Sequence, residues 1–107
     1  MIVVTGSVTA REDSFGEVRR LSLEHVHRSR GEPGCISHAV HVDCENPLRL
    51  VFIEQWESAA AVRQHFAVPA SAEFVRGAAA LADSPPSLEM FSATPAGGLA
   101  ADDVSAG

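Results

Sequence analysis

The chain opens with a segment in which large apolar residues alternate with small or polar ones. In an extended backbone, one side of this segment carries Ile2, Val4, Gly6 and Val8. The other side carries Val3, Thr5, Ser7 and Thr9. Alternation with a period of two predicts a β-strand over 2–9 whose two faces differ in character.

Helical spacing follows. From Phe15 to about Arg30 the apolar positions recur three or four residues apart, and His25 falls inside the same stripe. Ser14, with Glu17 three residues later, has the pattern of a capping box at the start of this helix. Pro33-Gly34 predicts that the helix has ended before a new strand begins.

The rest of the chain predicts three strands and two helical pieces. Strands are expected over 35–42 and 48–56, with a turn over 43–47 in which Asn46-Pro47 favours a bend. Ser58 can cap a helix that Pro69 interrupts, and a further helical piece is expected over 71–82. Pro85-Pro86 ends that piece, and a last strand is expected over 87–94.

The order β-α-β-β-α-β predicts an α+β fold of the ferredoxin-like type, with a four-stranded antiparallel sheet and its helices on one face. The strand over 48–56 is apolar on both sides, with Leu50, Phe52 and Trp56 on one and Val51 and Ile53 on the other. A sheet with two apolar faces needs cover on both. We therefore expect a homodimer that packs sheet against sheet.

Length and charge narrow the possible partners. The 107 residues indicate one domain over 1–95, followed by a Gly-, Ala- and Asp-rich tail over 96–107. The formal net charge is −6, which argues against nucleic acid because phosphate binding needs concentrated positive charge. The sequence has neither the ~18 consecutive apolar residues of a membrane span nor the pattern of a signal peptide. No membrane partner and a cytoplasmic location are expected.

Local spacing offers no metal or cofactor motif. On a helix His25 and His27 point about 200° apart, and on a strand His38 and His41 lie on opposite faces. A Gly-x-Ser-x-Gly turn, a phosphate loop and a dinucleotide fingerprint are all missing from the sequence. We therefore expect neither a metal nor another cofactor.

The remaining candidates for a site border a pocket between sheet and helices. His65 lies beside an apolar helix stripe, as His25 does on the first helix. Such histidines are often hydrogen-bonded core residues, and they are also common general bases. Phe52 and Trp56 form an aromatic wall on one strand face for a planar ligand, with Glu54 between them to orient a partner. Ser7 is a candidate for the pocket floor.

Several of these residues form a pattern that resembles the antibiotic biosynthesis monooxygenase domain family over roughly residues 1–92. The pattern consists of Glu32-Pro33-Gly34-Cys35, Asp43 with Pro47, Glu54-x-Trp56, and His65. The resemblance implies a dimeric α/β barrel. It also implies oxidation of a phenolic or quinol-type aromatic by molecular oxygen without metal or flavin. His65 matches the family's histidine on the second helix, so the resemblance implies that it is the catalytic base.

Proteins with the same fold have other functions, and the sequence leaves these open as alternatives. The main alternative is a non-catalytic dimer that binds a small ligand or responds to stress. Some relatives degrade haem with an asparagine, a tryptophan and a histidine, but this chain has Ser7, His65 and Ala78 near those positions. Others isomerise a small sugar-like molecule. The chain has no tyrosine, which excludes a tyrosine-assisted mechanism.

Overall fold

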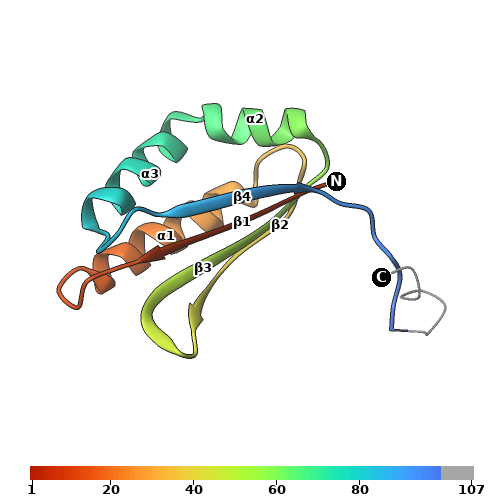
Figure 1. The fold of residues 1–107 in the computed structure, drawn as a ribbon. Helices are drawn as coiled ribbons and strands as arrows, with labels where there is room; N and C mark the ends of the chain where they lie inside the picture. The colour runs from red at the N-terminus through yellow and green to blue at the C-terminus, as the bar shows by residue number, and fades with distance from the viewer. Residues whose placement is uncertain (100–107) are drawn as a thin grey trace.

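The computed structural model describes residues 1–99. Within them the elements follow the order β1 (Ile2–Thr9), α1 (Phe15–Ser29), β2 (Cys35–Asp43), β3 (Asn46–Trp56), α2 (Ala59–Ala67), α3 (Pro69–Leu81) and β4 (Ser87–Ser92). The four strands form one antiparallel sheet in the order β2-β3-β1-β4, with the three helices along one side of it (Figure 1). The predicted α+β, ferredoxin-like fold is confirmed.

The alternation along the central strands decides which face meets the helices. Val4 lies opposite Glu54 and Val8 opposite Leu50 in the β1–β3 pairing, and all four side chains are buried. Ile53, on the other face of β3, is 46% exposed. The helix-facing side of the sheet is thus the core, as the two-faced pattern of β3 predicts.

Two buried clusters fill this core. One joins Val8, Leu50 and Phe52 of the sheet to Val18 and Val26 of α1. The other contains Trp56 with its neighbours Val4, Ala61 and Val62, near the start of α2. The candidate site touches both clusters, since Val8 and Phe52 line its cavity and Trp56 packs against His65, so the packed core holds the backbone that carries it.

Two local expectations are wrong. The turn between β2 and β3 is tighter than predicted, because Asp43 pairs with Asn46 and leaves Cys44-Glu45 as the turn. Pro47 lies inside β3 at its second residue, a strand-start position where a missing N–H is tolerated.

The predicted capping box at the start of α1 is the second wrong expectation, because Ser14 precedes α1 without a capping hydrogen bond. Its Oγ instead donates to the Leu81 carbonyl at 2.7 Å, which ties the start of α1 to the end of α3.

Other boundaries differ by one or two residues. The third helix begins at Pro69, two residues before the predicted start, because proline is well suited to the first helical position. The last strand ends at Ser92. The predicted tail over 96–107 remains a prediction, and its residues 100–107 lie outside the described part of the chain. Within residues 1–99, none of the helices has the length and apolarity needed to span a membrane.

Candidate functional site

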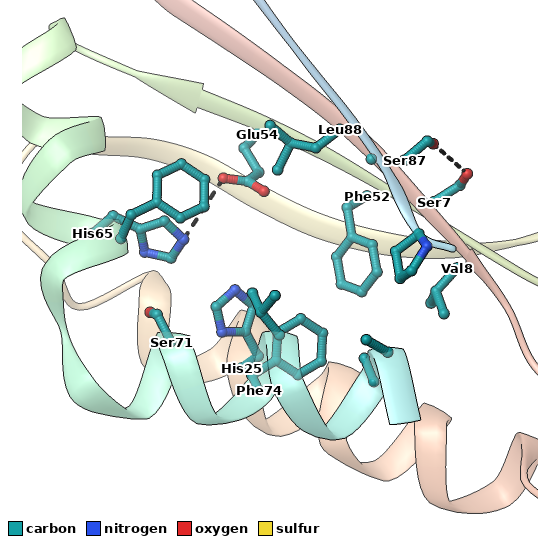
Figure 2. Close-up of a pocket in the computed structure, with 16 residues that line it drawn as sticks. Ser7, Val8, His25, Phe52, Glu54, His65, Ser71, Phe74, Ser87 and Leu88 are labelled. Atoms are coloured by element: carbon teal, nitrogen blue, oxygen red, sulfur yellow. Dashed lines mark hydrogen bonds and ion pairs between the residues drawn. The ribbon is translucent and has the colours of Figure 1, made fainter. Parts of the chain in front are cut away.

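A cavity of about 250 Å³ lies between the sheet and helices α2 and α3. Its lining is mainly apolar. His25, Glu54, His65 and Ser71 form its polar end, and Ser7 and Ser87 lie at the opposite margin (Figure 2). The lining residues that matter for chemistry are His25, Phe52, Glu54, His65, Ser71 and Phe74. A small cavity with apolar walls and few polar groups is the usual form of a small-molecule site.

His65 is the polar group best suited to accept a proton. It lies on α2 and is 1% exposed. Its Nδ1 is 2.7 Å from Oε1 of Glu32. A carboxylate can only accept, so Nδ1 carries the hydrogen and Nε2 keeps a lone pair. Among residues 1–99, no group forms a hydrogen bond with Nε2, which lies 3.9 Å from Oε1 of Glu54.

Glu54 is a buried carboxylate with two aromatic neighbours. Its Oε1 accepts a hydrogen bond from Trp56 Nε1 at 2.9 Å and lies 3.3 Å from Nε2 of His38. Burial pushes the pKa of Glu54 upward, but the nearby His38 and the Trp56 indole N–H outweigh that effect and hold the pKa below its usual range. The side chain therefore presents a negative charge at the polar end of the cavity.

His25 is held in the neutral form. Its ring stacks on Phe74 with the centroids 4.2 Å apart and an interplanar angle of 10°. Nη2 of Arg28 donates to its Nδ1 at 2.8 Å. Burial, reinforced by the nearby His38, His65 and Arg28, lowers the pKa of His25 to about 3. Both His25 and Phe74 form part of the cavity wall.

The turn that carries Glu32 depends on Gly34. Gly34 has a φ of +81°, and a Cβ there would lie 2.5 Å from Cβ of Ala61 in α2. Its carbonyl accepts a hydrogen bond from the Glu57 backbone at 2.8 Å. Only glycine allows this backbone to pass so close to α2. The close approach brings Glu32 beside His65.

The structure brings five of the six predicted site residues to the cavity: Ser7, His25, Phe52, Glu54 and His65. Ser7 lies at its margin. In the β1–β3 register it is opposite Val51, on the outer face of the sheet, and its hydroxyl bonds to Ser87 at 2.8 Å (Figure 2).

The sixth residue, Trp56, does not line the cavity. It is fully buried behind His65, with the ring centroids 4.6 Å apart. Of the predicted aromatic wall, Phe52 lines the cavity and Trp56 does not. Phe74 takes that place, with its centroid 5.8 Å from that of Phe52.

Several residues at the site were not predicted to be site residues from the sequence. Phe74, Ser71 and Ala78 line the cavity from one side of α3, and their spacing of three and four residues was a signal that could have identified them. Glu32 belongs to the Glu-Pro-Gly pattern, but nothing in the sequence pairs it with a residue 33 positions away. His38 is 2% exposed on the helix-facing side of β2, and its partners come from other elements.

The fold and the cavity define a class: a ferredoxin-like α+β domain with a small apolar pocket beneath its helices. The sequence profile described as antibiotic biosynthesis monooxygenase matches residues 1–77. The chain belongs to the antibiotic biosynthesis monooxygenase family.

Individual relatives agree with this assignment. An uncharacterized Synechocystis protein, sll1783, is 33% identical over 90 residues, which are 84% of this chain and 61% of that protein. This chain therefore spans less than two thirds of its relative's length. A crystal structure of an antibiotic biosynthesis monooxygenase is 27% identical with a TM-score of 0.82, covering 89% of this chain and 100% of that one.

More distant structures share the fold. Rv0793 from Mycobacterium tuberculosis is 20% identical with a TM-score of 0.82, over 88% of this chain and 95% of that one. The family match and these structures agree on the fold of this chain.

Proposed function

We propose that the protein is a cofactor-independent monooxygenase that oxidises a small phenolic or quinol-type aromatic with molecular oxygen. The observation that carries the proposal is the environment of His65. Its Nδ1–H is fixed by Glu32 at 2.7 Å, and the lone pair of Nε2 is left free at the edge of an apolar cavity. This arrangement suits a general base whose tautomer is set by a carboxylate.

The chemistry needs few protein groups. Nε2 of His65 takes the phenolic proton, and the carboxylates of Glu32 and Glu54 stabilise the resulting imidazolium. The electron-rich phenolate passes an electron to oxygen, and the superoxide formed couples to a ring carbon. Loss of water from the hydroperoxide leaves a carbonyl there. For an anthrol the balance is anthrol plus O₂ to anthraquinone plus water, so the substrate supplies all the electrons.

The cavity walls favour a flat, small substrate. The rings of Phe52, Phe74 and His25 offer aromatic faces, against which a planar ring packs well. Ser71 lines the same cavity, and its buried Oγ has no hydrogen-bond partner within residues 1–99. A second oxygen on the substrate would satisfy this hydroxyl, and this favours a quinol over a phenol with a single oxygen.

We also propose that the protein works as a homodimer formed through the outer face of the sheet. On this face Ile53 is 46% and Phe91 48% exposed, and the register places Val3 opposite Phe91. An apolar face on an antiparallel sheet needs cover. A second copy of the chain supplies a matching apolar face.

Oxygen uptake with a panel of hydroquinones and anthrols tests the activity. Wild type should consume oxygen with at least one compound, and His65→Ala should lose about a hundredfold or more of that rate, the usual contribution of a general base. His27→Ala, at an exposed position on α1, is the matched control and should retain the rate. Full turnover by His65→Ala would rule out His65 as the base.

The alternative function is a dimer that binds a small ligand without transforming it. The same cavity serves that function, so binding alone does not separate the two. Trp56 is the only tryptophan and packs against His65, so its fluorescence reports on ligands in the cavity. Binding by this readout without any oxygen uptake would favour the alternative.

A further inference from the structure

Three histidines from three different elements meet at the polar end of the cavity. His25 comes from α1, His38 from β2 and His65 from α2, and all three are at most 5% exposed. Taking one ring nitrogen from each histidine, the three nitrogens lie within 4.8 Å of one another. We propose that His25, His38 and His65 form a binding site for a divalent transition-metal ion, with Glu54 as the adjacent carboxylate.

The spacing of the rings fits such a site. Their centroids are 5.3 Å apart for His25 and His38, 5.1 Å for His25 and His65, and 5.5 Å for His38 and His65. In a tetrahedral site with three histidines, a metal–nitrogen distance of about 2.0–2.1 Å puts the ring centres about 5 Å apart. The rings already have the separation that a shared ion requires, and rotation of the rings would bring the nitrogens inward.

The free nitrogens point to the same conclusion. Within residues 1–99, Nδ1 and Nε2 of His38 and Nε2 of His65 are buried without a hydrogen-bond partner. Leaving such groups unpaired in a protein interior is unfavourable. A bound cation would give a lone pair on each of these two rings a partner; Nε2 of His38 otherwise has the contact with Oε1 of Glu54 at 3.3 Å.

The surrounding groups resemble a metal site's supporting shell. Glu32 holds Nδ1–H of His65 at 2.7 Å, the carboxylate–histidine arrangement that orients a metal ligand. Glu54 lies 3.3 Å from His38 and 3.9 Å from His65 and supplies negative charge. Imidazole ligands suit Zn²⁺, Cu²⁺, Ni²⁺ and Fe²⁺, whereas Mg²⁺ and Ca²⁺ need more oxygen ligands.

Arg28 is the group with which a metal would compete. Its Nη2 donates to Nδ1 of His25 at 2.8 Å. Because Nδ1 of His25 accepts this hydrogen bond with its lone pair, the ring hydrogen of neutral His25 is on Nε2. Binding by His25 therefore requires Arg28 to release the ring. Removal of Arg28 should strengthen metal binding, because a competitor and a positive charge are lost together.

This inference goes beyond the proposed function and departs from the sequence expectation of no metal. That expectation considered only histidines close together in the sequence, whereas these three come from separate elements. The two proposals use the same lone pair on Nε2 of His65. A bound ion would therefore block the base, and Zn²⁺ should inhibit the cofactor-independent turnover.

The first test is a titration of the chelator-treated protein with Co²⁺, monitored by visible absorption, with Zn²⁺ as competitor. We expect one Co²⁺ per chain with an intense band of low coordination number. His38→Ala, which changes no cavity-lining residue, should weaken binding at least about tenfold. His41→Ala, exposed on the other side of β2, should not. Arg28→Ala should bind more tightly. Absence of a band in wild type, or equal weakening by His41→Ala, would overturn the proposal.

A second measurement needs no variant. Long-range ¹H–¹⁵N spectra of the imidazole rings should show Zn²⁺ shifting His25, His38 and His65 while His27 and His41 stay in place. Shifts confined to the exposed His27 and His41 would overturn the proposed metal site. Metal binding at these three rings without oxygen uptake would retain this inference and reject the proposed activity, whereas uptake without metal binding would do the reverse.

Discussion

At the scale of single residues, the hydrogen bond from His65 to Glu32 decides what the site can do. The carboxylate accepts from Nδ1 at 2.7 Å and so leaves the lone pair on Nε2, next to the cavity. Glu32 does not line the cavity and acts through His65. It is a positioning residue in the proposed reaction.

Glu32→Gln should therefore lower the oxygenation rate about tenfold or more with little change in KM. The amide can donate its N–H₂ to Nδ1, which stabilises the tautomer with a hydrogen on Nε2 and removes the base. Steady-state oxygen uptake measures the effect. Glu45→Gln, at the exposed β2–β3 turn, is the control. Equal rates for wild type and Glu32→Gln would show that this hydrogen bond does not matter for the reaction.

His25 couples stability to pH. Burial, together with the nearby His38, His65 and Arg28, lowers its pKa in the folded state to about 3 from 6.5, so the unfolded chain binds the proton first. The free energy of unfolding should therefore be fully present above about pH 6.5 and fall as the pH drops towards 3. His25→Phe, which can still stack on Phe74, should reduce this slope by about one proton. Urea denaturation in the presence of a chelator measures both slopes, and identical slopes would contradict the assignment.

At the scale of elements, the turn between α1 and β2 positions the site because it packs against α2. Gly34 has a backbone conformation and a clearance from Ala61 that exclude a side chain. A shift of this turn would separate Glu32 from His65. Fold and site therefore depend on the same residue.

Gly34→Ala should destabilise the protein by about 2 kcal/mol or more, through strain at positive φ and the clash with α2. Gly16→Ala is the matched control, since a Cβ there meets nothing within 4 Å and it lies in α1. It should stabilise by about 0.5–1 kcal/mol through helix propensity. Thermal unfolding of both variants measures the difference. A Gly34→Ala variant as stable as wild type would mean that the turn moves freely.

The sequence predicted the faces of individual helices and strands better than it predicted the contacts between them. The alternation of β3 and the helical stripe of α1 specify their faces, because burial imposes periods of 2 and 3.6. The same patterns identified His65, Phe52 and Glu54 at the cavity. They could not show that His38 meets His25 and His65, since each pairing joins separate elements. Nor could they show that His65 covers Trp56, because depth within a core depends on the packing of α2.

At the scale of the whole molecule, the uncovered side of the sheet sets the expected assembly. Ile53 and Phe91 remain half exposed on it, while the helices cover the other side (Figure 1). Because β3 carries both Ile53 and the cavity residues Phe52 and Glu54, a dimer through this face would also support the site from behind.

Ile53→Asp should shift the protein from dimer to monomer, because a charge buried against a second apolar sheet is costly. Val42→Asp is the matched control. It is 45% exposed but lies opposite Leu50, on the other side of the sheet, and should remain dimeric. Sedimentation velocity at micromolar concentration gives the molecular mass of both. A wild-type monomer would refute the proposed dimer.

In the proposed reaction, His65 deprotonates a phenol bound in the cavity. Its most direct test is the absorption spectrum of a chromogenic phenol, such as 4-nitrophenol, bound to chelator-treated protein without oxygen. Wild type should convert the bound compound to the phenolate at a pH below that needed in water. His65→Gln should bind it with similar affinity and leave it protonated. The same phenolate band in both proteins would show that His65 is not the base.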